Sequence, residues 1–463
     1  MSVLPIGISG EGQYTISRSL RFNSADSASL TRTPTADGNN NRWTFSFWMK
    51  YSQQNAANNP TILGLTGDGT GTDAIALTTS YGLTINCNTG SLYQLNTTRV
   101  FRDPSAWYHV IVAADVTNAT AAHRIRVYIN GVEETAFSTD NRSTLPNNAF
   151  SFNKQFLHAI GNNPAVSRYF AGLLAEIYMI DGQQLTPSSF GETDLITGVW
   201  KPKKYTGTYG TNGFYLNFSD NSGTTSTTLG KDSSGNGNNW TPNNFSVTAG
   251  AGNDSLVDTP TPYGSDTGVG GEVRGNYATL NPIQNPPSGA VSTAYSNGNL
   301  QTVLDSSVAR STFAPASGKW YAEFVITSAT LSTDTRFAVE PSSGNTFSGN
   351  AGQGRAYSAN GNKVFNGTST AYGSTWTQND IIGCALDLDN GKVWWSKNGT
   401  WQASGDPAAG TNEAFSGLSG EFNFTIVNGN SAVSKTFVAN FGQRPFAFSA
   451  PSGFKSLVTT NLP

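Results

Sequence analysis

Cysteine, histidine and charge are all scarce in this sequence, and each shortage narrows what the protein can do. The chain has 463 residues, of which 12% are charged, 3 are histidines and 2 are cysteines. Cys87 and Cys384 stand far apart, so we expect two buried free thiols and no disulfide framework. The formal net charge is −3 and no run of Lys and Arg occurs, which argues against a nucleic-acid-binding surface.

Long apolar runs and targeting signals are also absent from the sequence. No apolar run is long enough to span a bilayer, and the residues from Met1 to Gly7 form neither the basic nor the apolar region of a secretory signal. We therefore expect no signal peptide and no membrane insertion. Asn-X-Ser/Thr triplets such as the one at Asn96 are then expected to reflect composition and not glycan attachment.

Glycine and aromatic residues, by contrast, are plentiful. The chain has 50 glycines, and 11% of its residues are aromatic. Disordered chains lose their aromatic residues, and helical proteins use more Glu, Lys, Ala and Leu. We therefore expect an all-β protein of two or three domains. The fold should consist of many short strands and tight turns, with helical structure confined to one turn around Pro187 to Phe190.

Residues 43–49 and 124–134 have the period of two that indicates half-buried strands. Trp48 falls on the polar face of the first strand. The other face of that strand is apolar, with Trp43, Phe45, Phe47 and Met49. In the second stretch, Asn130 and Gly131 predict the turn of a β-hairpin.

The region that contains these strands resembles the laminin-G/pentraxin-like (concanavalin A-like) family. The resemblance lies in the order and spacing of residues 19–23, 45–48, 107–110, 128–131 and 170–178. It implies a β-sandwich and a structural role for His109, and it names no ligand.

Residues 380–401 are the most informative stretch of the chain. Two apolar runs are joined by Asn390-Gly391, and a second Asn-Gly pair follows at residues 398–399. A two-residue type I′ turn needs positive φ at both positions, which Asn and Gly tolerate. Alternation predicts one buried face and one wet face for the first strand. The buried face has Cys384, Leu386 and Leu388, and the wet face has Ala385, Asp387 and Asp389.

This hairpin resembles the hallmark hairpin of the SPRY (B30.2) family, whose β-sandwich binds partners and catalyses nothing. Residues 276–282, 318–324 and 437–446 match the same family pattern in order. The two resemblances together predict two antiparallel, jelly-roll-type β-sandwiches joined by a Gly/Asn-rich, partly ordered segment. The predicted boundaries are an N-terminal arm at 1–13, a laminin-G-like sandwich at 14–181, a connecting segment with an added strand at 182–276 and a SPRY-like sandwich at 277–463.

Catalytic constellations are not apparent in the sequence. No Gly-X-Ser-X-Gly elbow occurs, and neither cysteine has a local signature of a nucleophile. Glycoside hydrolases need two facing carboxylates. Asp387 and Asp389 share a strand face but precede a turn, where solvation is the simpler interpretation. We therefore assign no catalytic residue and expect no enzymatic activity.

Aromatic side chains around the SPRY-like hairpin are the candidate ligand-binding residues. Trp394, Trp395 and Trp401 cluster there, and an exposed indole could stack on a sugar. Alternation places Trp394 and Trp395 on opposite faces, so at least one of them is expected in the core.

Calcium is the one candidate cofactor. Asp232, Asn236 and Asn238 lie on a turn that offers oxygen ligands, as do Asp68 and Asp73 in a Gly-rich loop. Neither loop has the closing Glu of an EF-hand, and Asx turns explain the same residues without a metal. A calcium site at Asp232, Asn236 and Asn238 is therefore a hypothesis.

A laminin-G-like sandwich followed by a SPRY-like sandwich resembles structural proteins of tailed bacteriophage particles. The resemblance implies a fibre or decoration component on the virion exterior, made in the host cytoplasm. Its partners would be other virion proteins, sister subunits (a homotrimer favoured) and a host-surface glycan, with no nucleic acid and no membrane. Two alternatives stay open: a polysaccharide depolymerase on the concanavalin A-like domain, and a purely mechanical capsid cement.

Overall fold

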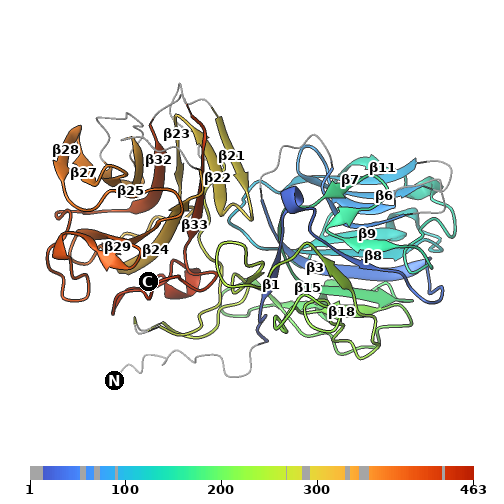
Figure 1. The fold of residues 1–463 in the computed structure, drawn as a ribbon. Helices are drawn as coiled ribbons and strands as arrows, with labels where there is room; N and C mark the ends of the chain where they lie inside the picture. The colour runs from blue at the N-terminus through green and yellow to red at the C-terminus, as the bar shows by residue number, and fades with distance from the viewer. Residues whose placement is uncertain are drawn as a thin grey trace, which may run out of the picture.

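Two β-sandwiches lie side by side in the computed structural model, the first in blue to green and the second in gold to red (Figure 1). The structure describes residues 14–52, 59–66, 73–88, 92–266, 268, 270–283, 292–328, 334–343, 354–429 and 433–463. The N-terminal arm predicted at residues 1–13 lies outside this set, as does Asp68. The all-β fold class is confirmed.

Helical structure in the described ranges consists of short 3-10 turns. They are η1 (Ser24–Asp26), η2 (Ala121–His123), η3 (Arg142–Thr144), η4 (Pro187–Ser189), η5 (Gln402–Ser404) and η6 (Thr459–Asn461). The turn predicted at Pro187 to Phe190 is thus present. Within the described residues, no helix has the length and hydropathy that a membrane crossing requires.

Two sheets face each other in the first sandwich, and all their strand pairs are antiparallel except β14 with β4. One sheet has β1 (Ser19–Phe22), β3 (Arg42–Tyr51), β8 (Tyr108–Asp115), β9 (Ile125–Ile129), β10 (Val132–Glu133), β15 (Gly172–Asp181), β18 (Phe214–Leu216) and β20 (Ser255–Leu256). Its order is β10-β9-β8-β3-β15-β1-β20, with β18 also paired to β15. The other sheet has β2 (Ser29–Arg32), β4 (Thr61–Leu65), β5 (Ala74–Leu77), β6 (Gly82–Asn88), β7 (Leu92–Val100), β11 (Phe137–Asp140), β12 (His158–Ile160), β13 (Asn162–Asn163), β14 (Arg168–Tyr169) and β19 (Thr241–Asn243). Its main order is β11-β7-β6-β5-β4-β12-β2-β19.

The second sandwich is also made of two antiparallel sheets. One has β21 (Ser292–Ser296), β22 (Gln301–Asp305), β24 (Lys319–Ile326), β29 (Ile381–Asp387), β30 (Lys392–Lys397), β31 (Thr400–Trp401) and β33 (Lys435–Asn440), in the order β21-β22-β33-β24-β29-β30-β31. The other has β23 (Ser307–Arg310), β25 (Thr335–Pro341), β26 (Arg355–Ser358), β27 (Asn362–Phe365), β28 (Thr368–Ala371) and β32 (Phe422–Asn428), in the order β23-β32-β25-β26-β27-β28.

Strand β3 has the two faces that its sequence predicts. One face packs into the core between the two sheets, with Trp43, Phe45, Phe47 and Met49. Trp48 points to the other side of the sheet and joins a separate apolar cluster. The predicted hairpin β9–β10 is also present, with φ of 49° at Asn130 and 81° at Gly131. A side chain at Gly131 is excluded, because its Cβ would lie 2.5 Å from the Trp200 ring.

The turn between β29 and β30 differs from the prediction. Asp387 pairs with Lys392, so a longer loop joins the strands, and in its Asn390-Gly391 pair only Gly391 has positive φ, at 63°. The Asp387 carboxylate explains this, since it accepts hydrogen bonds from the backbone N–H of Asn390 at 3.0 Å and from its side-chain amide at 2.8 Å. The second Asn-Gly pair, at residues 398–399, does form the two-residue turn, between Lys397 and Thr400.

The face of β29 that the sequence predicts to be solvent-exposed is buried as well. Ala385 packs in a second apolar cluster with Tyr321, Trp394 and Phe454. Asp387 is 1% exposed, and its carboxylate lies 3.1 Å from Nζ of Lys319. The expectation that solvent covers Asp387 is therefore wrong, because the C-terminal segment folds over this face; Asp389 is exposed as expected.

The segment between the sandwiches folds onto the first of them. It contributes β18, β19 and β20, and it contains a separate hairpin of β16 (Gly191–Thr193) and β17 (Trp200–Pro202). A single apolar cluster then continues from the outer face of the first sandwich into the core of the second. Its members include Trp48, Leu173, Leu256, Leu280, Trp320 and Phe324. The two sandwiches therefore share buried surface.

Candidate functional site

The tryptophans proposed to bind ligand do not form an exposed platform. Trp394 and Trp395 are both fully buried, on opposite faces of β30. Neither indole can offer a ring face to a sugar, because both faces of this strand are covered, so these two assignments are corrected. Trp401 is half-buried beside Tyr321, with ring centroids 6.3 Å apart. Of the three tryptophans, Trp401 therefore remains a candidate ligand-binding residue.

The turn proposed to hold calcium is closed by its own hydrogen bonds. Oδ1 of Asp232 accepts from the backbone N–H of Tyr215 at 2.9 Å and of Ser234 at 2.8 Å, and Oδ2 accepts from the N–H of Asn238 and the hydroxyl of Ser234, each at 2.8 Å. The Asn236 side chain donates to main-chain carbonyls. No group of three or more His, Cys, Asp or Glu side chains that could hold a metal ion occurs within the described ranges. The structure therefore uses Asp232 as an Asx-turn residue.

His109 is buried beside a serine, but its tautomer is wrong for activating a nucleophile. The indole N–H of Trp200 donates to Nδ1 at 2.9 Å, and Nε2 lies 2.9 Å from Oγ of Ser46. Because an indole only donates, Nδ1 has no proton, and the neutral ring carries its proton on Nε2. That nitrogen then donates to Ser46 and cannot accept its proton. Burial lowers the pKa of His109 to about 3.

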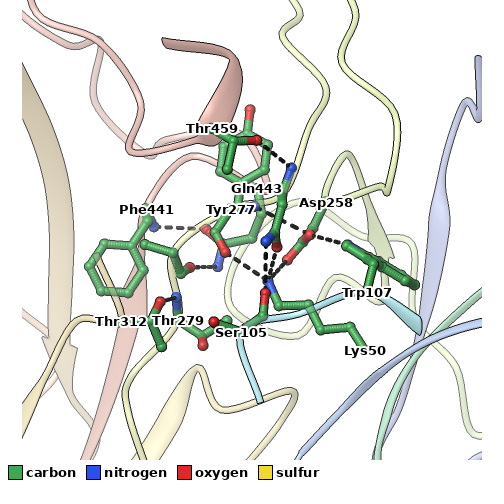
Figure 2. Close-up of polar contacts among 12 residues, drawn as sticks. Lys50, Ser105, Trp107, Asp258, Tyr277, Thr279, Thr312, Phe441, Gln443 and Thr459 are labelled. Atoms are coloured by element: carbon green, nitrogen blue, oxygen red, sulfur yellow. Dashed lines mark hydrogen bonds and ion pairs between the residues drawn. The ribbon is translucent and has the colours of Figure 1, made fainter. Parts of the chain in front are cut away.

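A buried lysine joins the first sandwich to the connecting segment (Figure 2). Nζ of Lys50, on β3, donates to Oδ2 of Asp258 at 2.8 Å, to Oδ1 of Asn276 at 2.8 Å and to the carbonyl of Tyr277 at 2.7 Å. All three ammonium protons therefore have acceptors. Oδ1 of Asp258 accepts from the Trp107 indole at 3.0 Å. Burial lowers the pKa of Lys50, and the Asp258 carboxylate opposes that change.

A second buried ion pair reaches the second sandwich. Nε of Arg21, on β1, donates to Oδ1 of Asp254 at 2.9 Å. The Ala251 carbonyl accepts from Arg21 at 3.3 Å and from Arg444 of the second sandwich at 3.1 Å. Burial lowers the pKa of Arg444 to about 9. Charged side chains from both sandwiches thus hold the connecting segment. These contacts fix the geometry of the junction between the two sandwiches.

A third buried charge holds the first described residue of the chain. Glu176 lies at a bulge of β15 with φ of 51°, and its carboxylate accepts from the hydroxyls of Tyr14 at 2.5 Å, Tyr178 at 2.8 Å and Tyr215 at 2.7 Å. Burial raises the pKa of Glu176, and the three hydroxyls oppose this. The segment that enters at Tyr14 is therefore fixed to the outer face of the first sandwich.

An open hollow lies at the C-terminal end of the chain. Two adjoining hollows of about 660 and 590 Å³ are both lined by Asp266. The first is lined by residues 264–266 and 317–320, by Asp389, and by Gly453, Lys455 and residues 460–463. We call the pair the C-terminal groove. Trp320 lies in its lining, with its indole N–H donating to the Ser317 carbonyl at 2.7 Å.

Polar groups in the C-terminal groove are left with unused hydrogen-bonding capacity. The ammonium of Lys455 has no acceptor in the part of the chain that the structure describes. Asp389 and Asp266 each use Oδ1 to accept a backbone N–H, from Gly318 at 2.7 Å and Gly268 at 2.8 Å. Their Oδ2 atoms have no donor among the described residues. Free donors and acceptors beside buried aromatics suit a polyhydroxylated ligand.

Sequence reasoning missed both the junction and the C-terminal groove. Lys50 is the only charged residue within residues 43–51, and a lone charge in an apolar strand was the available signal for a buried partner. Asp258 lies 208 residues away, so no local pattern could name it. The groove is lined by segments that are remote from one another in sequence, so it gives no local signal.

Family models match both sandwiches. Residues 22–189 match the model described as the concanavalin A-like lectin/glucanases superfamily, and residues 330–444 match the SPRY domain model. The chain carries a concanavalin A-like domain and a SPRY domain. Domains of these two types suggest carbohydrate or protein binding, and the first superfamily includes glucanases as well as lectins.

Solved structures with similar folds include examples of both domains. The SPRY domain of human HERC1 is 20% identical and covers 34% of this chain and 98% of its own, with a TM-score of 0.28. A native heptameric SAP-like pentraxin from Limulus polyphemus is 14% identical, covering 38% of this chain and 80% of its own, with a TM-score of 0.27. Domain 4 of an extracellular arabinanase from Geobacillus stearothermophilus, in complex with arabinotriose, is 25% identical, covering 32% and 64%, with a TM-score of 0.25.

Proposed function

We propose that this chain is a non-enzymatic binding protein whose two domains act as one rigid unit. The observation that carries the proposal is the shared core, in which Trp48 and Leu173 of the concanavalin A-like domain pack in one cluster with Trp320 of the SPRY domain. Ordinary domain pairs within a chain move relative to one another unless their interface is large and apolar. Here an apolar interface with buried ion pairs opposes such motion. A rigid unit of this kind suits a protein that presents binding surfaces.

The surface that we propose to bind ligand is the C-terminal groove, and the proposed ligand is a glycan. Lys455, Asp266 and Asp389 supply unused donors and acceptors there. Hydroxyl groups of a sugar can satisfy both the donors and the acceptors. The buried ring of Trp320 makes the wall of the groove rigid. Single contacts of this kind are weak, and many copies on one particle would add up through effective concentration.

The setting that we propose is the exterior of a tailed bacteriophage particle, as a fibre or decoration component. The pairing of the two domains supports this, together with their low charge and dense turns. Imaging of an intact particle would locate the chain. A few copies at the tail that bind host polysaccharide would support recognition, a lattice-filling number of copies without binding would favour the mechanical cement, and absence from the particle would refute a virion role.

A depolymerase is the second candidate function, because one observation favours it. Asp266 and Asp389 line the same hollow, and two carboxyl groups in one groove are what glycoside hydrolysis needs. The discriminating assay is release of reducing ends from host envelope polysaccharide by the intact chain. We expect none. Release that disappears in both Asp266→Asn and Asp389→Asn variants would establish the enzyme instead.

A further inference from the structure

The hairpin β16–β17 ends in an apolar tip that nothing covers. Leu195 is 99% exposed and Ile196 is 96% exposed, the highest values for large apolar side chains in the described residues, and Val199 is 60% exposed. Soluble proteins rarely group such side chains on the surface without a partner. We call these three residues the apolar tip.

The apolar tip is rigidly built. Oδ1 of Asp194 accepts from the backbone N–H of Ile196 at 3.0 Å and of Thr197 at 2.9 Å, and the N–H of Asp194 donates to the Val199 carbonyl at 2.8 Å. The base of the hairpin is fixed by Trp200, whose indole binds His109. The loop therefore holds its apolar side chains outward in a defined position instead of letting them fold back.

An apolar pocket lies elsewhere on the chain. It has a volume of about 260 Å³ and lies between the connecting segment and the SPRY domain. Its apolar lining includes Phe324, Val325, Ile381, Val438, Pro445 and Phe446. The apolar tip of the same chain does not fill it, because that tip is exposed.

The polar side chains that line this apolar pocket already have partners. Arg444 donates to the carbonyls of Ala251 at 3.1 Å and Ala439 at 2.8 Å. Glu323 accepts from the N–H groups of Ala447 and Phe448, each at 2.8 Å. Asn440 donates to the Pro445 carbonyl at 3.1 Å. A polar guest would find little to bind, so the pocket fits an apolar one.

We propose that the apolar tip of one copy inserts into the apolar pocket of a second copy of this chain. The contact is heterologous, since two different surfaces meet, so copies join head to tail and either close into a ring or extend. A membrane fits the tip less well. Glu192 and Asp194 flank it, and Lys201, the one cation of residues 191–202, lies 3.4 Å from both carboxylates, whereas membrane-binding segments present unpaired cations.

The contact is expected to be weak in dilute solution. Stable interfaces bury about 1,200–2,000 Å², and the tip of one short hairpin provides only part of that. Association should therefore appear at high protein concentration or within an assembly, where effective concentration is high. The proposal does not depend on glycan binding, because the C-terminal groove takes no part in it.

Cysteine cross-linking separates this contact from its alternatives. Ile196→Cys places a thiol on the tip, and Ala447→Cys places one at the exposed edge of the pocket. The native thiols are buried and do not compete. We expect an intermolecular disulfide when the two single variants are mixed under mild oxidation, and far less with either variant alone. A disulfide in Ile196→Cys alone would mean that tips meet tips, which overturns the proposal.

Sedimentation velocity of the full chain across a concentration series supplies a second measurement. We expect Leu195→Ser with Ile196→Ser, and separately Val325→Lys in the pocket, to weaken self-association at least 10-fold. The tip variant should keep its thermal midpoint, because its side chains are already exposed. Val132→Ser, at another exposed hairpin, is the matched control and should change nothing. Unaltered association in both variants, or binding of the tip to phosphatidylserine vesicles, would overturn the proposal.

Discussion

Nζ of Lys50 lies 2.8 Å from Oδ2 of Asp258, and both side chains are almost completely enclosed. A strand of the concanavalin A-like domain and the connecting segment therefore share one ion pair away from water. Such a pair is not in itself strong evidence for stability, because removing two charges from water is costly. Its effect is clear when one partner is lost, because the other charge is then buried alone.

Removing the lysine should unfold the junction. We expect Lys50→Met to lower the free energy of unfolding by about 3–5 kcal/mol, because Asp258 is left buried without its cation. Chemical denaturation of the full chain measures this. The double variant Lys50→Met, Asp258→Asn should recover part of the loss.

The matched control is a partly exposed pair of the same domain. Arg126 and Glu133 lie 2.5 Å apart with 30% and 32% of their side chains exposed, and Arg126→Ala should change stability by about 0–1 kcal/mol. A loss at Lys50 no larger than at Arg126 would mean that the buried pair does not hold the connecting segment to the first sandwich.

Acid should weaken the fold through His109. Burial lowers its pKa to about 3, whereas an unfolded histidine titrates near about 6.5. Between those values the unfolded chain binds a proton that the folded chain does not, so stability is complete above about pH 6.5 and falls as the pH drops toward 3.

The variant His109→Gln isolates this effect, because an amide can accept from Trp200 without titrating. Between pH 7 and pH 5 it should lose about 2 kcal/mol less unfolding free energy than the unaltered chain. Unfolding curves at the two pH values test this, with His123→Gln, at an exposed position, as the control. Equal losses in all three proteins would contradict a buried neutral His109.

The turn at Asp232 should be independent of calcium. Its carboxylate accepts four hydrogen bonds from the chain itself, so Asp232→Asn should lower stability by about 1–3 kcal/mol by weakening those bonds. We expect the same loss with millimolar Ca²⁺ and with a chelator. A midpoint that rises with Ca²⁺ only in the unaltered chain would show that this turn binds the ion. Asp220→Asn, at an exposed turn, is the control.

Glycan binding should depend on the free ammonium in the C-terminal groove. We expect Lys455→Ala to weaken binding of host polysaccharide by about 10-fold, the value of one charged hydrogen bond. Biolayer interferometry with the full chain measures this. Lys204→Ala removes an equal charge at an exposed position and should bind as before. Equal binding by both variants would place the glycan elsewhere.

The local sequence pattern was sufficient to predict the strands and several turns. The alternation in β3 assigned Trp43 and Trp48 to opposite faces, and Asn130-Gly131 marked its hairpin, because strand period and positive φ are properties of neighbouring residues. The same pattern placed Trp394 and Trp395 on opposite sides of β30. Both family resemblances followed from such runs.

Only the tertiary structure decided which faces are covered. Alternation says that side chains share a face, and it does not say what lies against that face. Trp394 and Asp387 are buried because the C-terminal segment with Phe454 packs over them, and Lys50 is paired because Asp258 arrives from a distant part of the chain. Burial and ion pairing depend on contacts between remote segments, and those contacts exist only once the chain has folded.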